Sequence, residues 1–331
     1  MVWGKEAIAA GNWKLPRLLR TLHDHKGSVE TLAFSPNGKI LASGGGNLDP
    51  KIRLWNLETG EKIRTLRGHK TRVLTVAIAP DTQTLVSGSD DSMLNFWNLE
   101  TGKLTHTFWQ LSTNITSLKI SPDGQILVSA GLDGLKLWDL NKQRLIKTLA
   151  PFETFYAVAI SPDGRLLASG SKDGSVKVWN LTTGSYIGTL KGYHQPVNAL
   201  TFAADGFTLA TASYNSSIKI WNLETQEITH TLYHSHNQVY SLAINPRSPI
   251  LASAGQDGIS LWDLRNGQLL SQLPGHSDWV RTIAFSPDGQ LLVSGGFDKK
   301  VKIWQLVNNN PTYPAVVESR HFFTKNYPSK T

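Results

Sequence analysis

The sequence predicts an all-β fold, a seven-bladed β-propeller of four-stranded antiparallel blades, from a tryptophan repeat, a set of turns and a closing strand. Tryptophan recurs every 41 or 42 residues, and each copy ends a short run with alternating apolar residues: Trp55, Trp97, Trp138, Trp179, Trp221, Trp262 and Trp304. Turns of the Ser-Pro-Asp-Gly type, such as Ser121–Gly124, precede most of these runs. Proline and glycine favour tight turns there, and a period near 40 residues is typical of sheets arranged around an axis.

Each repeat unit contains four predicted strands. In the second unit these are Val73–Ala79, Thr84–Ser89, Met93–Asn98 and Lys103–Phe108. The first strand of a unit is almost continuously apolar, as in Leu200–Phe202, which indicates a strand covered on both faces. Stacking such sheets radially would cover these faces and leave only short edges.

The two ends of the repeat region predict how the ring closes. The fourth strands end in Thr-Leu or a variant of it, as at Thr65-Leu66, and Arg17–Leu22 carries the same signature before the first full unit. The last unit stops after Trp304-Gln-Leu306 without a fourth strand. We therefore expect the N-terminal segment to supply the outer strand of the last blade. The predicted domains are a leader at 1–16, a propeller at 17–306, and an extension at 307–331 that is mobile or packed on the surface.

Composition places the chain in the globular class. Of 331 residues, 40% are hydrophobic and 18% charged, and the longest apolar stretches fall far short of the roughly 20 residues that cross a bilayer. No secretory signal is evident. Without cysteine the chain can form no disulfide or thiolate site, which suits a cytoplasmic protein.

The net charge of +8 leaves two interpretations open. It could attract nucleic acid or another anionic surface, or it could come from a basic rim on a soluble protein. The basic residues of the tryptophan strands are predicted to lie on the circumference of the ring: Lys51, Arg53, Lys177, Lys219 and Lys302.

The repeat units resemble WD repeats, and their regularity is similar to that of bacterial WD-repeat proteins. Trp138-Asp139 and Trp262-Asp263 give the namesake pair, and the other five units have Trp-Asn or Trp-Gln. Gly68-His69 and Gly275-His276 match a second feature of the family. The resemblance covers residues 17–306 and implies a propeller that binds partners on the face formed by the loops before the first and third strands of each blade.

The same resemblance implies a buried hydrogen-bond relay of histidine, serine, aspartate and tryptophan in three blades. These sets are His25, Ser43, Asp49 and Trp55; His69, Ser87, Asp91 and Trp97; and His276, Ser294, Asp298 and Trp304. His, Asp and Ser together could suggest a hydrolytic triad, but a set repeated around a ring favours structural hydrogen bonding. The other four blades depart from the pattern, with Leu111, Pro151 or Phe152, Tyr193 and Ser235 at the histidine position, and Asn215 in place of the aspartate in the Tyr193 blade.

No catalytic residue, metal site or cofactor site is predicted. His23 and His25, like His234 and His236, are paired without a third ligand nearby in sequence, and Gly44-Gly45-Gly46 lacks the lysine of a phosphate loop. The chain is therefore predicted not to be an enzyme and to need no cofactor.

Large aromatic and basic residues in the loops are the predicted partner-binding residues. These are Trp279, Phe297, Tyr214, Lys172, Arg72 and Leu132, with Trp109, Phe152 and Phe155 in nearby loops. Rigid aromatic area and arginine dominate protein interfaces, although such rings could instead fill the blade junctions. We expect a non-catalytic protein-interaction scaffold whose partners are proteins of unknown identity. It would be a monomer or a subunit of a hetero-complex. The alternative is a nucleic-acid or anionic-surface binder, and an enzyme is the least favoured class.

Overall fold

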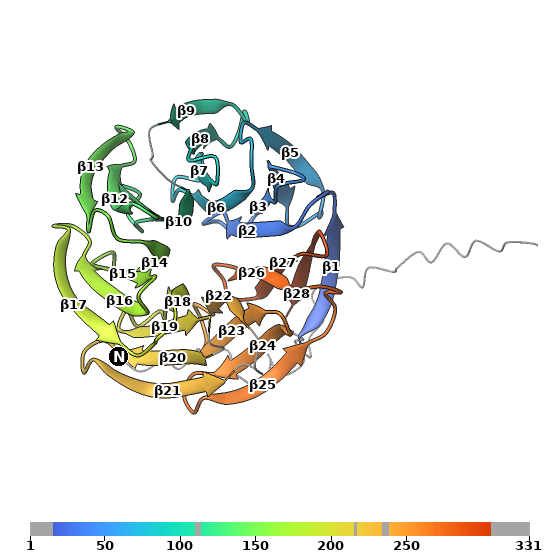
Figure 1. Cartoon of the computed structure of the whole chain (residues 1–331). Coiled ribbons are helices and arrows are strands. Elements are labelled where there is room, and N and C mark those ends of the chain that lie inside the picture. Colours follow the sequence, from blue (N-terminus) through green and yellow to red (C-terminus); the bar gives the residue numbers. More distant parts are fainter. Residues whose placement is uncertain (1–15, 110–113, 215–216, 234–237, 306–331) are drawn as a thin grey trace, which may run out of the picture.

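A computed structural model describes residues 16–109, 114–214, 217–233 and 238–305. These residues form a ring of seven four-stranded antiparallel sheets around a central channel (Figure 1). No helix occurs in the described part of the chain, and none there is long and apolar enough to cross a membrane. The predicted seven-bladed propeller is thus confirmed. The predicted extension and all of the predicted leader but Pro16 lie outside the described residues.

The strands are grouped by their place in the blades, from the channel outward. The inner strands are β2 (Val29–Phe34), β6 (Val73–Ile78), β10 (Ile115–Ile120), β14 (Phe155–Ile160), β18 (Val197–Phe202), β22 (Val239–Ile244) and β26 (Val280–Phe285). The second strands are β3 (Ile40–Gly45), β7 (Thr84–Ser89), β11 (Ile126–Gly131), β15 (Leu166–Ser171), β19 (Thr208–Ser213), β23 (Ile250–Gly255) and β27 (Leu291–Gly296). The tryptophan strands are β4 (Lys51–Asn56), β8 (Leu94–Asn98), β12 (Gly134–Asp139), β16 (Ser175–Asn180), β20 (Ser217–Asn222), β24 (Gly258–Asp263) and β28 (Lys300–Gln305). The outer strands are β5 (Lys62–Arg67), β9 (Leu104–Phe108), β13 (Arg144–Leu149), β17 (Ser185–Lys191), β21 (Glu227–Tyr233), β25 (Gln268–Leu273) and β1 (Arg17–His23).

We number the blades from the N-terminus, so that blade 1 is β2–β5 and blade 7 is β26–β28 with β1. The predicted strands of blade 2 agree with β6 to β9 to within one residue at each end. Strand β1 pairs antiparallel with β28, from Arg17 opposite Gln305 to His23 opposite Lys300. The predicted closure by an N-terminal outer strand is confirmed.

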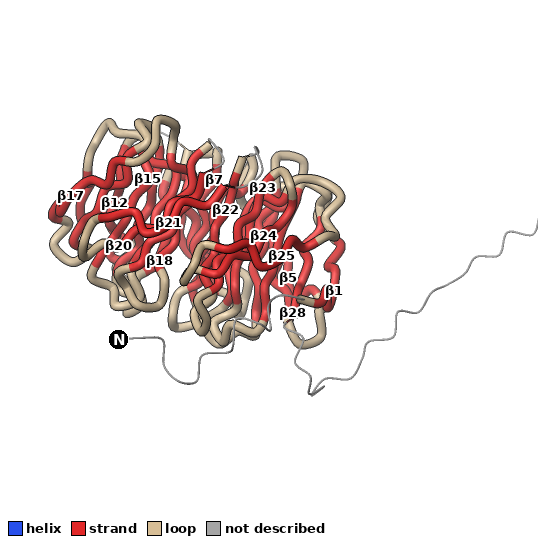
Figure 2. The backbone as a smooth tube through the Cα atoms, turned by 90° about the horizontal axis from the view of Figure 1, so that it is seen from below, coloured by secondary structure: helices blue, strands red, loops and turns tan. Residues whose placement is uncertain are grey.

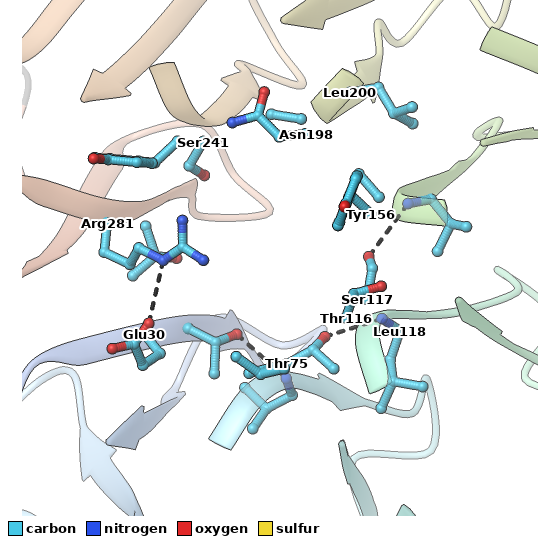
Figure 3. A pocket seen from close by; sticks show the side chains of 18 of the residues that line it. Glu30, Thr75, Thr116, Ser117, Leu118, Tyr156, Asn198, Leu200, Ser241 and Arg281 are labelled. Carbon is cyan, nitrogen blue, oxygen red and sulfur yellow. Dashed lines mark hydrogen bonds and ion pairs between the residues drawn. The ribbon is translucent and has the colours of Figure 1, made fainter. Parts of the chain in front are cut away.

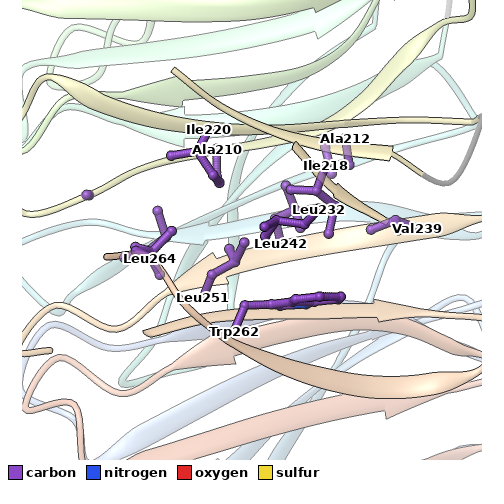
Figure 4. Packing of buried hydrophobic residues seen from close by; sticks show 13 residues of the cluster. Ala210, Ala212, Ile218, Ile220, Leu232, Val239, Leu242, Leu251, Trp262 and Leu264 are labelled. Carbon is purple, nitrogen blue, oxygen red and sulfur yellow. The ribbon is translucent and has the colours of Figure 1, made fainter. Parts of the chain in front are cut away.

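The hydrophobic core is divided among the junctions between neighbouring blades. Seven clusters of buried residues each combine side chains from two successive blades. At the junction of blades 5 and 6, Trp262 of β24 packs with Ile218 and Leu232 of the preceding blade (Figure 4). Truncating a tryptophan in such a cluster to alanine typically costs about 3–5 kcal/mol. The repeated tryptophan thus acts mainly between blades.

Loops cover both faces of the ring (Figure 2). We call the loop face the one that carries the loops before the inner strands and those before the tryptophan strands. Backbone hydrogen bonds join the two loops within a blade, as from Asp90 N to Arg72 O (3.3 Å) and from Phe297 N to Trp279 O (2.8 Å). These bonds hold the predicted partner-binding loops against one another.

The predicted position of the basic residues is wrong for two of them. Arg53 and Lys302 are only 3% and 5% exposed. Arg53 is buried because Asp24 from the loop after β1 and Asp49 from blade 1 both pair with it. For Lys302, burial lowers the pKa, although the nearby Asp298 opposes this shift.

Candidate interaction surface at the channel mouth

A β-bulge in every inner strand shapes the channel mouth, which we define as the end of the central cavity at the loop face. The register with the second strand shifts after the first residue of each inner strand, as between Val29 and Thr31 in β2. The residue skipped by the register is re-aimed by the bulge. The seven skipped residues all line the central cavity: Glu30, Leu74, Thr116, Tyr156, Asn198, Tyr240 and Arg281.

This ring of bulge residues differs from blade to blade and links neighbouring blades by polar contacts. Arg281 Nε of blade 7 donates to Glu30 Oε2 of blade 1 at 3.2 Å (Figure 3). Thr116 donates to the carbonyl of Phe155 at 2.8 Å, and Asn198 to the carbonyl of Val239 at 2.6 Å. The bulge residues therefore stabilise the contacts between blades, and they also line a cavity of about 350 Å³ that a ligand or partner could enter.

An aromatic cluster lies beside this ring on blades 6 and 7. The Trp279 ring centroid is 5.6 Å from that of Phe297 and 6.2 Å from that of Tyr240. The Arg281 guanidinium lies 5.2 Å from the centre of the Tyr240 ring. Trp279 is 43% exposed and Phe297 36%, so both rings keep apolar area accessible while their contacts hold them in place.

The other predicted partner-binding residues are distributed around the same opening. Arg72, Leu132 and Tyr214 line the central cavity, and Leu132 and Tyr214 are exposed. Arg72 is paired with Asp90, which also accepts a hydrogen bond from Asn114 at 2.8 Å. Lys172 is exposed in the loop before β16 and does not line the cavity.

The nearby aromatic residues fall into two groups. Trp109 and Phe152 are 72% and 95% exposed, as expected for loops. The expectation that Phe155 lies in a loop is wrong, because it is the first residue of β14 and is fully buried between blades 3 and 4.

Every blade contains the tryptophan part of the relay. Each indole N–H donates to the hydroxyl of a serine, or in blade 5 of a threonine, on the second strand at 2.8–3.0 Å. Both groups are buried in every blade. The bond satisfies a buried donor and sets the orientation of the tryptophan against the neighbouring blade.

Histidine extends this pair in blades 1, 2 and 7. The Nε2 atoms of His25, His69 and His276 each lie 2.7 Å from the hydroxyl of Ser43, Ser87 or Ser294. Asp91 and Asp298 lie 3.0 and 2.9 Å from the Nδ1 atoms of their histidines, and Asp49 lies 3.3 Å from that of His25. Burial raises the pKa of Asp91 and Asp298, but hydrogen bonds from the histidine and from backbone N–H groups outweigh it and lower the pKa.

Blade 1 differs because Arg53 enters the relay. Its Nη1 atom lies 2.7 Å from Asp49 Oδ2 and 2.9 Å from His25 Nδ1. The pKa of Asp49 is low because hydrogen bonds from His25, the backbone and Arg53 outweigh its burial. Burial lowers the pKa of His25, and the charge of Arg53 adds to this effect although Asp49 opposes it. Blade 1 therefore holds a neutral histidine beside a buried ion pair.

Tyr193 takes the histidine position in blade 5. Its hydroxyl lies 2.8 Å from Thr211 Oγ1 and accepts a hydrogen bond from Lys219 N at 3.0 Å. Burial raises the pKa of Tyr193, against hydrogen bonds that lower it, so the phenol stays neutral. In blade 4, Pro151 and Phe152 are exposed, and neither reaches Ser169. Leu111, Asn215 and Ser235 lie outside the described residues.

The geometry separates two arrangements of polar groups. The relay is buried, repeated and occupied by its own hydrogen bonds, which suits a structural role. No group of three His, Asp or Glu side chains able to hold a metal ion was found among the residues that the structure describes. The channel mouth, in contrast, has bulge residues of six different types in its seven blades, next to exposed aromatic rings. It is the candidate interaction surface.

Sequence reasoning missed the bulge ring although a signal for it was present. The second residue of each inner strand varies in type between the repeats, from Glu30 to Tyr156 to Arg281, while an apolar residue always precedes it. Such variation within a regular repeat marks a position that does not serve the common packing. The strand pattern alone did not reveal that this second residue is a bulge residue that faces the channel.

Comparisons with known proteins agree with this architecture. A family described as the IFT122 first beta-propeller matches residues 46–237, and the family described as WD domain, G-beta repeat matches 16–56, 226–263 and 267–305. The chain belongs to the WD-repeat β-propeller family.

Several curated proteins are similar over part of the chain. The chain is 46% identical over 68 residues to protein groucho of Drosophila melanogaster, covering 20% of the chain and 9% of that protein. It is 40% identical over 73 residues to the periodic tryptophan protein 2 homolog of Neurospora crassa, covering 22% and 8%. It is 34% identical over 88 residues to the small ribosomal subunit protein RACK1y of Oryza sativa, covering 25% and 26%. The chain thus spans only a minor part of each of these relatives.

Proposed function

We propose that this propeller is a non-catalytic scaffold that binds partner proteins at the channel mouth of its loop face. The observation that carries the proposal is the cluster of Trp279 and Phe297, two exposed rings in edge contact beside the variable bulge ring. Protein interfaces concentrate their binding energy in rigid aromatic residues of this kind. The protein would work in the cytoplasm, as a monomer or as a subunit of a hetero-complex.

The pairing of charges at the mouth favours a protein partner over nucleic acid. Arg72 is paired with Asp90 and Arg281 with Glu30, while Arg53 and Lys302 are buried. These cations therefore have little free charge with which to displace counterions from a phosphate backbone.

The test is a quantitative affinity purification with mass spectrometry of the full chain and a Trp279→Ala/Phe297→Ala variant. Each ring is expected to contribute about 1–2 kcal/mol or more to binding, so the variant should lose specific partners by tenfold or more. Because both rings are partly exposed, the thermal melting of the variant should change little.

The matched control is Ile146→Ala/Ile187→Ala on the outer strands β13 and β17. These residues are 55% and 52% exposed, so the control also removes accessible apolar area, but away from the channel mouth. Equal loss of partners in both variants would contradict the proposal. A sharp fall in melting temperature with binding intact would show that Trp279 and Phe297 are core residues instead.

A further inference from the structure

Lys119 is an exception to the repeat inside the central channel. It is the fifth residue of the inner strand β10 and lines the central cavity. The other inner strands carry small residues at this position: Ala33, Ala77, Ala159, Thr201, Ala243 and Ala284. Five of these six residues pack into the cores between blades, and Lys119 alone among the seven lines the cavity.

The ammonium group of Lys119 has no anionic partner in the described part of the chain. Only two acidic residues line the cavity, and both are already occupied: Glu30 pairs with Arg281, and Asp90 pairs with Arg72. Lys119 is exposed to the solvent in the channel. The protein atoms of the channel wall nevertheless desolvate its ammonium group, which lowers the pKa of Lys119. Such a residue gains nothing for the fold by being charged, which is the usual mark of a binding position.

The groups next to Lys119 supply further hydrogen-bond donors. Ser117, two residues earlier and on the same face of β10, accepts a hydrogen bond from Val158 N at 3.3 Å (Figure 3). Thr75 Oγ1 on the adjacent inner strand accepts one from Leu118 N at 3.0 Å. Because both oxygens act as acceptors toward the backbone, each hydroxyl proton remains free to be donated. Among the described residues, neither proton has an acceptor.

We propose that the central channel binds a small molecule bearing a phosphate or carboxylate group, with Lys119 as its cation. The hydroxyls of Ser117 and Thr75 donate to the same anionic group. A cavity of about 350 Å³ is within the size range of metabolite-binding pockets. This site lies within the channel and does not use Trp279 or Phe297, so it is independent of the proposed protein-binding role.

The test is isothermal titration calorimetry of the full chain with inorganic phosphate, glycerol phosphate and succinate, with chloride as the ionic-strength control. We expect one molecule bound per chain for at least one of these probes. Lys119→Ala should weaken this binding by about tenfold or more, since a charge-assisted contact is lost. The substitution restores the residue that five other blades have, so the fold should tolerate it.

Two control variants make the result specific. Lys142→Ala removes an exposed lysine outside the channel and should leave binding unchanged. Trp279→Ala/Phe297→Ala should also bind the anion normally, which separates this site from the protein-binding surface. The proposal is overturned if no probe binds, if Lys119→Ala binds as well as the natural chain, or if only an acidic peptide, and no free anion, binds through Lys119.

Discussion

The junction between blades 1 and 2 and the junction between blades 4 and 5 have similar apolar cores but different polar contacts. Each is filled by a cluster of buried side chains around a tryptophan, Trp97 in the first and Trp221 in the second. Apolar burial of this kind provides most of the stabilisation of a packed interface. The two junctions therefore share the stabilisation from apolar burial, which the repeated sequence encodes.

The difference lies at the inner and outer ends of the interface. Between blades 1 and 2, Thr31 accepts a hydrogen bond from Val76 N at 3.3 Å, and Arg64 donates to the carbonyl of Glu100 at 2.8 Å. The corresponding residues between blades 4 and 5 are Ala157 and Gly188, whose side chains can neither donate nor accept. Inter-blade hydrogen bonds are thus additions to a common core, and we expect them to make the junctions unequal in stability.

The largest expected effect tests whether the ring as a whole depends on its closure. Deleting Arg17–His23 removes β1 and exposes the edge of β28, including Trp304, which lies opposite Leu18. The loss of one outer strand should remove a large share of a typical free energy of unfolding of about 5–15 kcal/mol. It also opens the ring and leaves the edge of β28 unpaired. We expect an insoluble protein or one with a broad transition in calorimetry. A truncated chain that melts like the intact one would contradict the role of this closure.

The next effect compares the relays of blades 2 and 4. His69→Leu removes one hydrogen bond from the Ser87 hydroxyl and one from the Asp91 carboxylate, which keeps its bonds from Lys70 N and Met93 N, at a cost of about 2–3 kcal/mol. Ser169→Ala in blade 4 removes the acceptor of the Trp179 indole and a long hydrogen bond from Ser169 to the carbonyl of Lys177, at a cost of about 1 kcal/mol. Urea denaturation of both variants measures the difference. Equal losses would mean that the histidine and aspartate add nothing to the tryptophan–serine bond.

A smaller effect is expected from the titration of His25 in blade 1 between pH 7 and 5. The pKa of His25 is lowered in the folded state, so the unfolded chain takes up its proton first as the pH falls below about 6.5. Stability is therefore lost as the pH decreases, with a slope that one proton limits to about 1.4 kcal/mol per pH unit. His25→Gln should flatten the pH dependence between pH 7 and 5. An unchanged slope in urea titrations would show that His25 is not responsible.

Much of the fold followed from the sequence because the repeat encodes it several times. The strands of blade 2 and the closing strand Arg17–Leu22 agree with β6 to β9 and β1. Features that join residues from different blades did not follow. The burial of Arg53 depends on Asp24, which precedes it by 29 residues and belongs to another blade, so no local pattern reveals the pair.

The candidate surface was predicted only in part for the same reason. Trp279 and Phe297 could be identified as loop residues, but their edge contact depends on how the two loops meet. The sequence did not indicate a role for Lys119, because a single lysine does not disturb the pattern that predicts an inner strand. The structure shows that its side chain lines the central cavity, which the corresponding residues of the other blades do not.

The outer end of the junction between blades 4 and 5 offers a finer contrast with the junctions where an arginine faces a glycine. Arg20 and Arg64 reach over Gly60 and Gly102 of the next blade, and any side chain at these glycines would collide with the arginine. In blade 5 the turn residue is Gln226, at φ 59°, and the facing residue of blade 4 is Gly188, which has open space around it. Where the turn residue has a side chain, as at Gln226, the facing position 188 has glycine in place of arginine.

This pairing predicts the smallest effect, a coupling measured by a double-mutant cycle. Gly188→Arg alone should change the free energy of unfolding little, because blade 5 has Gln226 at the turn position where Arg20 and Arg64 face a glycine. Gln226→Gly alone should relieve the positive φ and stabilise the chain slightly. Together they should gain about 0.5–1 kcal/mol beyond the sum of the single changes, since one exposed inter-blade hydrogen bond is formed. Strict additivity in urea denaturation would mean that the arginines of the other junctions do not depend on the facing glycine, and that apolar packing alone distinguishes the two junctions.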